Sequence, residues 1–423
     1  MNLNKLLEGV LCKECGKTHT CPIENIYVEA GAISHLEKLI ESYSSILIVA
    51  DENTYSAGKE TEKYLKSKNV ERVIFTGSEV LIPDERAIER ITKATSNMEL
   101  ILGIGSGVIQ DLCKYVSHFE KIPYIIVATA PSMDGYASNG AAMILKGMKE
   151  TVSCGLPRAI VADTEILRNA PIEMIKAGYG DIIGKLSCLN DWKLSTLVNG
   201  EYFCQYIYDS TYEMIEKTIK TAKGLLERRE ESVRALSEAL MQVGIMMSFA
   251  TTSRPASGSE HHLSHFFEIT GIVHGEDYLP HGIDVAYSTV LTQRLREEIL
   301  SLDSFDKQHS LPRNEYEAII NRLYGSAGKG CIALQDKMGR YKQSRREIYS
   351  ENQDKIKEIL KETPPSSEIE RLLMIAGLDM SQLYATYSEE KIENAILYAK
   401  DLKDRYTVLW LYYDLLGDKN GQK

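Results

Sequence analysis

Short apolar runs alternate with amphipathic stretches over about the first 160 residues, and this pattern predicts strands that alternate with helices. The expected strands are residues 45–50, 72–75, 100–104, 124–128 and 158–162. The expected helices are residues 33–43, 57–68, 83–95 and 108–119. Two further short segments, 141–145 and 150–153, are split by Lys146 and Gly147 and predict a hairpin. The alternation is typical of a parallel sheet with crossover helices.

The pattern changes after Asp163, and from Pro171 onward nearly every segment has helical periodicity. The expected helices include residues 211–228, 233–251, 284–302 and 390–416, and a strongly charged, solvated helix over residues 337–362. Because 423 residues exceed one ordinary hydrophobic core, we expect two domains. We predict an α/β domain over residues 1–164, which includes a cysteine-rich segment at 1–22, followed by an all-α domain over residues 165–423.

The composition narrows the classes of partner. The net charge is −11, which makes nucleic acids and anionic membranes poor partners, since both need a basic protein surface. No apolar run approaches the length that a bilayer requires. The N-terminal segment lacks the apolar core and the cleavage site of a signal peptide, so we expect a cytoplasmic protein. Most of the eight cysteines are scattered, as suits reduced thiols.

Three of the cysteines are close together near the N-terminus. Cys12, Cys15 and Cys21 lie within ten residues, with His19 between the last two. Thiols and an imidazole at such spacing can hold a structural zinc ion, although a second cysteine pair at the usual distance is missing. The alternative is a small N-terminal hairpin with free thiols.

A glycine-rich turn joins an expected strand to an expected helix at residues 100–111, and it contains Gly103, Gly105, Ser106 and Gly107. Glycine lets the backbone approach a ligand, and the helix N-terminus offers unpaired N–H groups and a partial positive charge. A diphosphate suits such a turn. The alternative is that the glycines serve only the geometry of a tight turn.

Two other expected strand ends suggest the same ligand. Asp51 follows the run at 45–50, where a carboxylate can accept hydrogen bonds from a ribose and favour NAD over NADP. Its alternative role is a helix N-cap. The segment at 129–135 (Thr-Ala-Pro-Ser-Met-Asp-Gly) suits a loop that lines a cofactor, with Asp134 reaching further toward a substrate. The alternative is a type I turn, which favours Asp and Gly.

Histidines are concentrated in one short region. Five of the nine histidines lie between residues 261 and 281. His261 and His265 are four residues apart and share one face of an expected helix. His281 stands at the end of a loop, before a helix that we expect to start near residue 283, and His274 in the same loop is an alternative to it. This spacing indicates a site for a metal ion.

A third ligand must come from elsewhere, and Asp181 is the best candidate. It has a glycine before it and lies in the segment Gly-Tyr-Gly-Asp-Ile-Ile-Gly-Lys at residues 178–185, ahead of an expected helix. Two imidazoles and one carboxylate leave a coordination position open for a substrate oxygen. Zinc, iron(II) or nickel accept this set. The alternative is that Asp181 caps a helix and pairs with Lys185.

These motifs together resemble a known group of enzymes. The chain is similar to the superfamily of iron-dependent alcohol dehydrogenases, glycerol dehydrogenases and dehydroquinate synthases, and within it to the bacterial sn-glycerol-1-phosphate dehydrogenases. The matching segments are GSGVIQD (105–111), TAPSMDGYAS (129–138), GYGDIIGK (178–185), SRPASGSEHHLSH (253–265) and HGIDVA (281–286). The residues beyond about 290 and the cysteine-rich N-terminus match no motif of the family.

The resemblance implies a Rossmann-like α/β domain followed by a helical domain, in a dehydroquinate synthase-like fold with the active site in the cleft between them. It implies Asp181, His261 and His281 as metal ligands, with Asp181 also at the substrate. It places His265 and Asp134 at substrate positions. The implied cofactor positions are Asp51, Gly107, Val108, Ile109, Gln110, Asp111, Thr129, Ala130, Pro131, Ser132 and Ser138.

The implied reaction is the reversible, NAD- or NADP-linked reduction of dihydroxyacetone phosphate to sn-glycerol 1-phosphate, in phospholipid metabolism. One divalent metal (zinc, nickel or iron) would polarise the C2 carbonyl while the nicotinamide delivers hydride. His265 is a candidate route for the proton, or a residue that only orients the substrate. Arg254 is a candidate for the substrate phosphate, or a structural salt bridge. We expect a homo-oligomer, most simply a homodimer.

Three other functions remain open at this point. A dehydroquinate synthase-like lyase or cyclase would share the fold, the metal and NAD but would recycle the cofactor. A glycerol dehydrogenase would differ only in its substrate. A non-catalytic metal- or nucleotide-binding protein would be favoured by loss of a ligand, but Asp181, His261 and His281 are all present.

Overall fold

The computed structural model describes residues 3–77, 81–145 and 148–417. Contacts between Cα atoms divide the chain into two compact units. The first comprises Met1–Ile182 and Glu213–Thr252, and the second comprises Ile183–Tyr212 and Ser253–Lys423. The first unit is therefore discontinuous in sequence. The predicted boundary between residues 164 and 165 marks the change from strands to helices and, as a domain boundary, stays a prediction.

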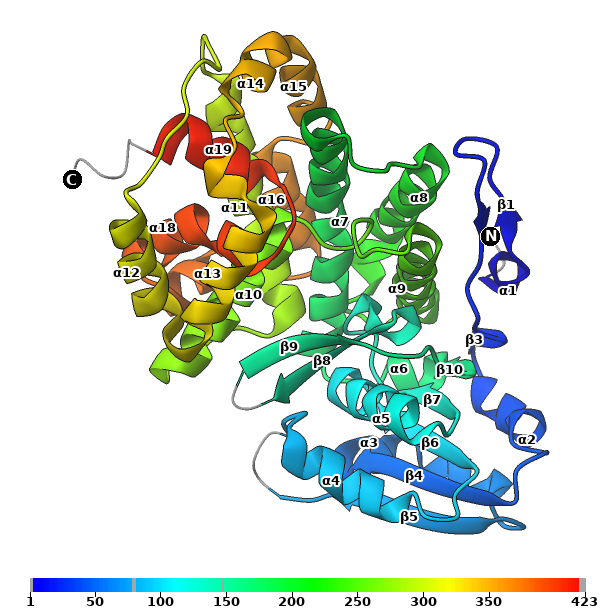
Figure 1. Cartoon of the computed structure of the whole chain (residues 1–423). Helices are drawn as coiled ribbons and strands as arrows, with labels where there is room; N and C mark the ends of the chain where they lie inside the picture. The colour runs from blue at the N-terminus through cyan, green and yellow to red at the C-terminus, as the bar shows by residue number, and fades with distance from the viewer. Residues whose placement is uncertain (1–2, 78–80, 146–147, 418–423) are drawn as a thin grey trace. The chain divides into compact units, whose positions relative to one another are not determined.

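A six-stranded sheet forms the centre of the first unit (Figure 1). Its order is β3 (Asn25–Glu29), β10 (Ala159–Asp163), β7 (Tyr124–Ala128), β6 (Leu100–Gly105), β4 (Ser45–Asp51) and β5 (Asn69–Phe75). All five neighbouring pairs are parallel. The structure thus confirms the predicted parallel sheet with all five of its expected strands, and it adds β3 at one edge.

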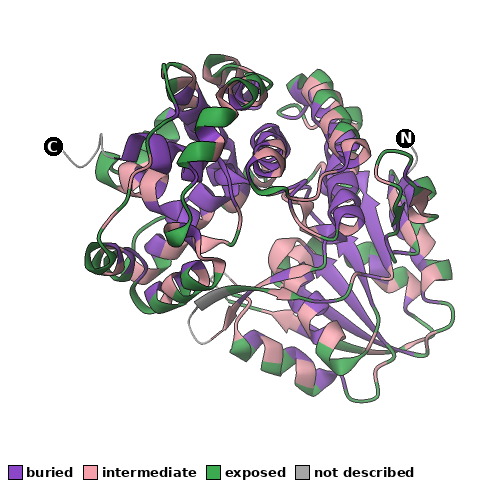
Figure 2. Ribbon diagram, turned by 45° about the horizontal axis from the view of Figure 1, so that its top comes forward, coloured by how far each residue is buried: buried purple, intermediate pink, exposed green. Residues whose placement is uncertain are grey.

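The extent of burial explains why the hydrophobic pattern of the sequence predicted the inner strands and missed the edge strand β3. The four inner strands are buried almost from end to end, so both of their faces are apolar and they read as continuous hydrophobic runs (Figure 2). The edge strand β3 alternates half-buried and buried residues over only five positions, which gives a much weaker signal. On one face Ile46, Leu102 and Val161 pack with Ile33 and Leu36. On the other face a Cβ on Gly103 would lie 2.8 Å from Cys113 Sγ of helix α5.

The helices of the first unit agree in part with the pattern. Helices α4 (Glu85–Ala94) and α5 (Gly107–Glu120) confirm two predictions. The expected helix at 33–43 is shorter and consists of η1 (Ala32–His35) and α2 (Leu36–Leu39). The expected helix at 57–68 is wrong in position, because α3 (Glu52–Ala57) ends at Gly58 and only the 3₁₀ turn η2 (Lys59–Tyr64) follows. A Cβ on Gly58 would lie 2.4 Å from Ile104, so glycine is kept there for a close approach.

Several smaller elements complete this unit. The predicted hairpin is present as β8 (Gly140–Leu145) and β9 (Met148–Ser153), while its turn at Lys146 and Gly147 lies outside the described residues. A second hairpin, β1 (Val10–Leu11) and β2 (Thr18–His19), follows the short helix α1 (Leu3–Leu7). Helix α6 (Thr164–Leu167) follows the sheet, and helix α9 (Glu230–Ala250) contacts α6 and β3.

Helix α7 (Ile172–Asn199) runs through the junction of the two units, with Ile182 the last residue of the first and Ile183 the first of the second. The expectation that residues 178–185 precede a helix is wrong, and with it the helix-cap alternative for Asp181, because this segment lies well inside the 28-residue helix. Its glycines serve packing. A Cβ on Gly178 would lie 1.8 Å from the Pro131 carbonyl oxygen, and one on Gly184 would lie 2.6 Å from Val285.

The second unit is helical. Helix α8 (Gln205–Thr221) begins in it, and it contains η6 (Arg340–Lys342) and η7 (Ala399–Leu402). Its other α-helices are α10 (Ser259–His274), α11 (His281–Leu300), α12 (Arg313–Tyr324), α13 (Gly328–Met338), α14 (Arg346–Glu351), α15 (Gln353–Leu360), α16 (Ser366–Ile375), α17 (Ser381–Thr386), α18 (Glu389–Tyr398) and α19 (Val408–Leu416). No helix in the described part of the chain is long and apolar enough to cross a membrane.

Two long helices predicted near the C-terminus are wrong. The expected solvated helix at 337–362 is divided among α13, η6, α14 and α15, because Gly339 has a φ of 64° and ends α13. Its charge is not all solvated, since Arg345 forms a buried ion pair with Asp414 at 2.7 Å. The expected helix at 390–416 is divided into α18 and α19, and the segment between them carries a buried ion pair of Lys400 and Asp401 at 2.8 Å.

Candidate functional site

Helices α10 and α11 bring three imidazoles together within the second unit. His261 and His265 are one turn apart on α10, and their ring centroids are 6.2 Å apart. His281 is the first residue of α11, a helix that was predicted to start near residue 283, and its ring centroid lies 5.2 Å from that of His261 and 5.6 Å from that of His265. The loop between the helices therefore returns the chain to the same face of α10.

Two neighbouring side chains orient these rings. His261 Nδ1 lies 2.7 Å from Glu260 Oε1, which also accepts a hydrogen bond from the Gly258 backbone N–H at 2.8 Å. Burial raises the pKa of Glu260, but the hydrogen bonds with His261 and Gly258 outweigh it, so the pKa lies below its ordinary value. His281 Nδ1 lies 3.2 Å from Ser264 Oγ. A histidine whose Nδ1 is held in this way presents Nε2 to a metal.

Asp181 lies close to these histidines through helix α7. One turn further along α7, Lys185 Nζ donates to the Ala256 carbonyl at 2.8 Å, just before α10. One ligand atom each from Asp181, His261 and His281 lies within 4.8 Å of the others. A carboxylate and two imidazoles fit a divalent ion such as zinc, iron(II) or nickel. The Asp181 carboxylate also accepts a hydrogen bond from the Asp134 backbone N–H at 3.0 Å.

The remaining two histidines of the region, His262 and His274, are not in this group. His274, the alternative ligand, has its Nε2 3.0 Å from the Leu323 carbonyl oxygen and is not in the group with Asp181. His262 is completely buried, and burial, followed by the charge of Arg405, lowers its pKa well below the ordinary value. His262 is therefore a neutral core residue.

The predicted cofactor loops meet at one edge of the sheet. Strands β4, β6 and β7 are adjacent and parallel, so Asp51, Gly105 and Thr129 lie at neighbouring carboxyl ends. The Thr129 backbone N–H donates to the Gly105 carbonyl at 3.1 Å and ties two of these ends together. Edges of this kind, at the carboxyl ends of parallel strands, are where open α/β sheets bind ligands.

The glycine turn leaves the start of α5 accessible to a ligand. Helix α5 has 14 residues, and Ser106, which precedes it, makes no side-chain hydrogen bond to the first turn. A Cβ on Gly107 would meet only the Met133 side chain, at 3.7 Å, whereas one on Gly105 would lie 2.5 Å from Ile109. Gly105 therefore serves the turn, while the backbone at Gly107 suits a diphosphate at a helix N-terminus.

Three other predicted cofactor residues, Ile109, Gln110 and Asp111, direct their side chains toward other residues of the protein. Ile109 packs on the turn, and Gln110 is buried and donates to Tyr124 Oη at 3.2 Å. Asp111 faces Lys114 at 3.4 Å. These contacts of Ile109, Gln110 and Asp111 support the turn, and a role of the three residues in cofactor binding stays a prediction.

Asp51 has the alternative role that the sequence left open. Its side chain accepts hydrogen bonds from the backbone N–H groups of Asn53 and Thr54, at 2.8 and 3.0 Å, and so caps α3. The helix-cap interpretation is confirmed. Because both bonds fall on one carboxylate oxygen, contact between the other oxygen and a ribose stays a prediction.

Hydrogen bonds hold the loop at residues 129–138 in place, and two of the residues that make them, Tyr136 and Lys114, were not singled out from the sequence. Tyr136 Oη donates to the carbonyls of Gly105 and Ala130, at 3.2 and 2.9 Å. Lys114, whose side chain is fully buried, donates to the carbonyls of Gly135 and Gly140. Ser138 Oγ donates to the Gly135 carbonyl at 3.1 Å. The turn alternative for Asp134 is confirmed in a 3₁₀ form, η3 (Asp134–Ala137).

Arg254 is bound within the second unit. Its guanidinium donates to Glu201 through Nε and Nη2, at 2.7 and 2.6 Å, and to the Tyr406 carbonyl through Nη1 at 2.9 Å. Arg254 is only 2% exposed. All three nitrogens are thus engaged, which favours the salt-bridge alternative over the phosphate contact.

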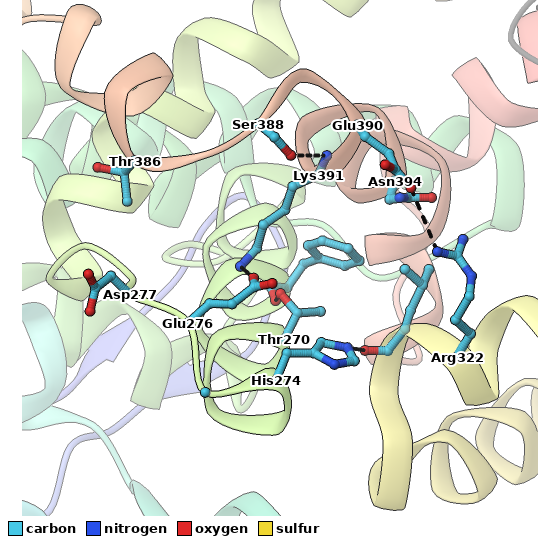
Figure 3. Close-up of a pocket in the computed structure, with 13 residues that line it drawn as sticks. Thr270, His274, Glu276, Asp277, Arg322, Thr386, Ser388, Glu390, Lys391 and Asn394 are labelled. Atoms are coloured by element: carbon cyan, nitrogen blue, oxygen red, sulfur yellow. Dashed lines mark hydrogen bonds and ion pairs between the residues drawn. The ribbon is translucent and has the colours of Figure 1, made fainter.

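A separate pocket in the second unit is lined by His274, the alternative ligand, and by none of the other predicted site residues (Figure 3). Four of its charged side chains form ion pairs, since Lys391 meets Glu276 at 2.7 Å and Arg322 meets Glu390 at 3.8 Å. Most of the charge that lines the pocket is therefore already paired.

The chain is similar to known dehydrogenases in sequence and in fold. The family described as iron-containing alcohol dehydrogenase matches residues 27–171. A glycerol-1-phosphate dehydrogenase [NAD(P)+] of Geobacillus thermodenitrificans is 32% identical over 76% of this chain and 82% of its own length. One of the same name from Geobacillus stearothermophilus is 27% identical over 98% of this chain and 99% of its own length.

Solved structures agree with the fold. An iron-containing alcohol dehydrogenase from Thermococcus thioreducens superposes with a TM-score of 0.59 at 15% identity, covering 93% of this chain and 98% of its own. That likeness concerns the fold, while the sequence matches define the relationship. The chain therefore belongs to the iron-containing alcohol dehydrogenase family, in the group of the NAD(P)-dependent glycerol-1-phosphate dehydrogenases.

Proposed function

We propose that this protein interconverts dihydroxyacetone phosphate and sn-glycerol 1-phosphate, with NAD or NADP as the hydride carrier and a divalent metal held by Asp181, His261 and His281. The observation that carries the metal site is the approach of one ligand atom from each of these residues to within 4.8 Å of the others. The substrate is supported by the relatives, which bear the name glycerol-1-phosphate dehydrogenase.

The protein's contribution at the metal is to hold and orient the ligands. Glu260 and Ser264 fix the rings of His261 and His281 through their Nδ1 atoms. The Asp134 backbone N–H fixes one oxygen of Asp181. When bound, the metal supplies Lewis-acid polarisation of the substrate oxygen at C2, a contribution of several kcal/mol. With three protein ligands, one coordination position is left for that oxygen.

Binding of the cofactor depends on backbone groups at the carboxyl ends of the parallel strands. The first N–H groups of α5, at Gly107 and Val108, suit the diphosphate, and the loop Thr129–Ser132 with Ser138 suits the remainder of the nucleotide. The cofactor supplies or accepts the hydride, so the chain has only to align it. Tyr136 and Lys114 hold the loop in place for that purpose.

The substrate oxygen also has to gain or lose a proton, and we assign this step to His265. The ring of His265 is half-buried and stacks at 5.6 Å on that of His281, so it lies beside the proposed metal without belonging to its ligand group. A proton carrier in this position is worth roughly 10²–10⁴-fold in rate.

The test is a comparison of substrates by nicotinamide absorbance. Purified protein with an added divalent metal should form NADH or NADPH from sn-glycerol 1-phosphate and consume it with dihydroxyacetone phosphate. Faster turnover with glycerol than with glycerol 1-phosphate would make the protein a glycerol dehydrogenase. Absence of any net change in nicotinamide with each of these substrates would contradict an oxidoreductase and favour a lyase or cyclase that recycles NAD.

Three finer properties belong to the same proposal. We propose zinc, nickel or iron as the native metal, a homodimer as the oligomeric state and the cytoplasm as the location. The structure has no disulfide among the eight cysteines, all of which lie in described residues, and this agrees with a reducing compartment. Metal analysis of protein purified without chelators and light scattering in solution test the first two.

A further inference from the structure

The N-terminal hairpin places two cysteines side by side. The Cys12 backbone N–H donates to the Lys17 carbonyl at 2.9 Å, and the Gly16 N–H donates to the Cys12 carbonyl at 3.0 Å. Gly16 has a φ of 71°, a left-handed conformation that glycine adopts without strain. The turn that connects β1 to β2 therefore folds back directly after Cys15, and both thiols belong to it.

His19 turns toward these thiols. Its Nε2 lies 3.4 Å from Cys15 Sγ. Its Nδ1 lies 3.0 Å from the Phe249 carbonyl oxygen, and its ring stacks on Phe249 with 5.3 Å between centroids. A carbonyl acceptor at Nδ1 fixes the proton there and leaves Nε2 as the coordinating atom, which is the usual arrangement for a metal-bound histidine. His19 is 2% exposed, so the ring is held inside the protein.

A fourth donor comes from a distant part of the sequence. Cys204, which precedes helix α8, has its Sγ within 4.8 Å of the ligand atoms of Cys12, Cys15 and His19, and the same limit holds between every pair of the four. Cys12 and Cys204 are 3% and 1% exposed. Three thiols and one imidazole are a complete ligand set for a structural zinc ion.

The spacing agrees with tetrahedral zinc. With Zn–S bonds of about 2.3 Å and Zn–N bonds of about 2.0–2.1 Å, sulfur and nitrogen ligands on one ion lie roughly 3.5 Å apart. The observed separation of Cys15 Sγ and His19 Nε2 is 3.4 Å. Cys21, which the sequence grouped with these residues, is not in the set.

We propose that Cys12, Cys15, His19 and Cys204 bind a structural zinc ion. Strands β1 and β2 have only two residues each, which is too few for a hairpin to be stable alone. A zinc ion with four protein ligands has no open position for a substrate, so its role is to stabilise the N-terminal segment. Thiols lose their protons on binding, so the affinity falls at low pH.

The experiment separates this zinc from the metal of the proposed active site. Full-length protein purified without chelators is analysed for zinc as wild type, as His261→Ala, as Cys15→Ser and as the double variant. His261→Ala should retain about one zinc per chain, the amount that one closed site holds, and the double variant should retain none. Cys21→Ser is the matched control, because it removes a buried thiol of the same segment and should leave the zinc content unchanged.

Cobalt substitution of the wild type gives a second readout, which remains valid even if a cysteine variant fails to fold. Thiolate-bound cobalt absorbs in the near-ultraviolet by charge transfer, whereas a site of one carboxylate and two imidazoles does not. We expect this absorption in the wild type and in His261→Ala, and its loss in Cys15→Ser and Cys204→Ser. A wild type without the thiolate absorption, or an intact mass that reveals a Cys12–Cys15 disulfide, would overturn the proposal. Zinc at the cysteines without any zinc, nickel or iron at Asp181, His261 and His281 would contradict the proposed active site instead.

Discussion

The two proposed groups of metal ligands in this protein differ in their donor atoms and in the residues that hold them. Asp181, His261 and His281 offer oxygen and nitrogen donors from helices α7, α10 and α11. The cysteine group offers mostly sulfur from a tight turn and from the start of α8. The first group has three ligands and leaves a position for substrate, while the second has four and is complete. One arrangement suits catalysis and the other suits structure.

The surroundings of the two groups sharpen this contrast. Both imidazoles of the first group are held by side chains of α10, Glu260 and Ser264, on regular helices. In the second group Nδ1 of the imidazole lies 3.0 Å from a backbone carbonyl oxygen, that of Phe249. Sites on regular helices hold their ligands more rigidly than sites on loops. The comparison therefore predicts that changes in the first group alter turnover, whereas changes in the second alter stability.

The largest expected effect is that of His261→Ala. Removing this imidazole should abolish metal binding at the first group and lower turnover by at least about 10³-fold, because several kcal/mol of Lewis-acid stabilisation are lost and each 1.36 kcal/mol is a factor of ten. Metal analysis and the nicotinamide assay on the same sample check this. Cys15→Ser is the counterpart, and it should retain turnover with glycerol 1-phosphate. Equal loss of activity in both variants would break the comparison.

The next effect concerns His265, which lies beside the first group without belonging to it. His265→Ala should keep the metal and lower kcat by roughly 10²–10⁴-fold if the ring carries the proton. If the ring only orients the substrate, KM should rise while kcat changes little. Steady-state kinetics with metal content measured in parallel separate the two roles. A variant that loses its metal would instead make His265 a ligand.

A smaller effect is expected at Glu260, which touches His261 but no substrate. Glu260→Gln keeps the size of the side chain and weakens the charged hydrogen bond to Nδ1, so the metal affinity should fall by about 10–100-fold. A competition titration with a chromogenic chelator measures this affinity directly. Recovery of wild-type kcat at saturating metal is the expected sign of a positioning role. An unchanged affinity would show that the hydrogen bond does not orient the ligand.

The smallest expected effect concerns the pH dependence of stability, and it comes from Asp284, a buried acid near the histidines. Asp284 on α11 accepts hydrogen bonds from Tyr387, yet burial, the largest cause, raises its pKa well above the ordinary 3.8. The folded protein thus binds this proton more tightly than the unfolded chain, and stability falls as pH rises from about 4 through the folded pKa. Asp284→Asn removes this dependence, so it should gain urea resistance over wild type at about pH 8 and lose that advantage toward pH 4. A constant difference across this range would contradict a raised pKa.

The sequence predicted the centre of the sheet and the grouping of His261, His265 and His281 well, for physical reasons. Buried parallel strands are apolar on both faces and read as unbroken runs, as in Tyr124–Ala128. His261 and His265 are one helical turn apart, which the sequence states directly. The same pattern failed where tertiary packing overrides local preference. Gly178 looks like a helix breaker, but it lies inside α7 because the Pro131 carbonyl leaves no room for a side chain.

The parts of the sites that could not be predicted are those that depend on distant segments. Cys204 is far from the N-terminal cysteines in the sequence, and nothing in its neighbourhood marks it as a ligand. Arg254 appears in a motif, but only the structure reveals Glu201 as its partner. Glu260 was not singled out either, although an acid directly before a candidate ligand on a helix could have marked it as a residue that holds the ring.

The most direct test of the account is the restoration of activity by metal. Protein stripped of its accessible metal should show no turnover of sn-glycerol 1-phosphate, and about one equivalent of a divalent ion should restore it in the wild type but not in Asp181→Asn, because three protein ligands are needed to hold a catalytic ion. Formation of NADH or NADPH is the readout. Full turnover in the metal-free protein, or equal restoration in Asp181→Asn, would contradict a catalytic centre built from Asp181, His261 and His281.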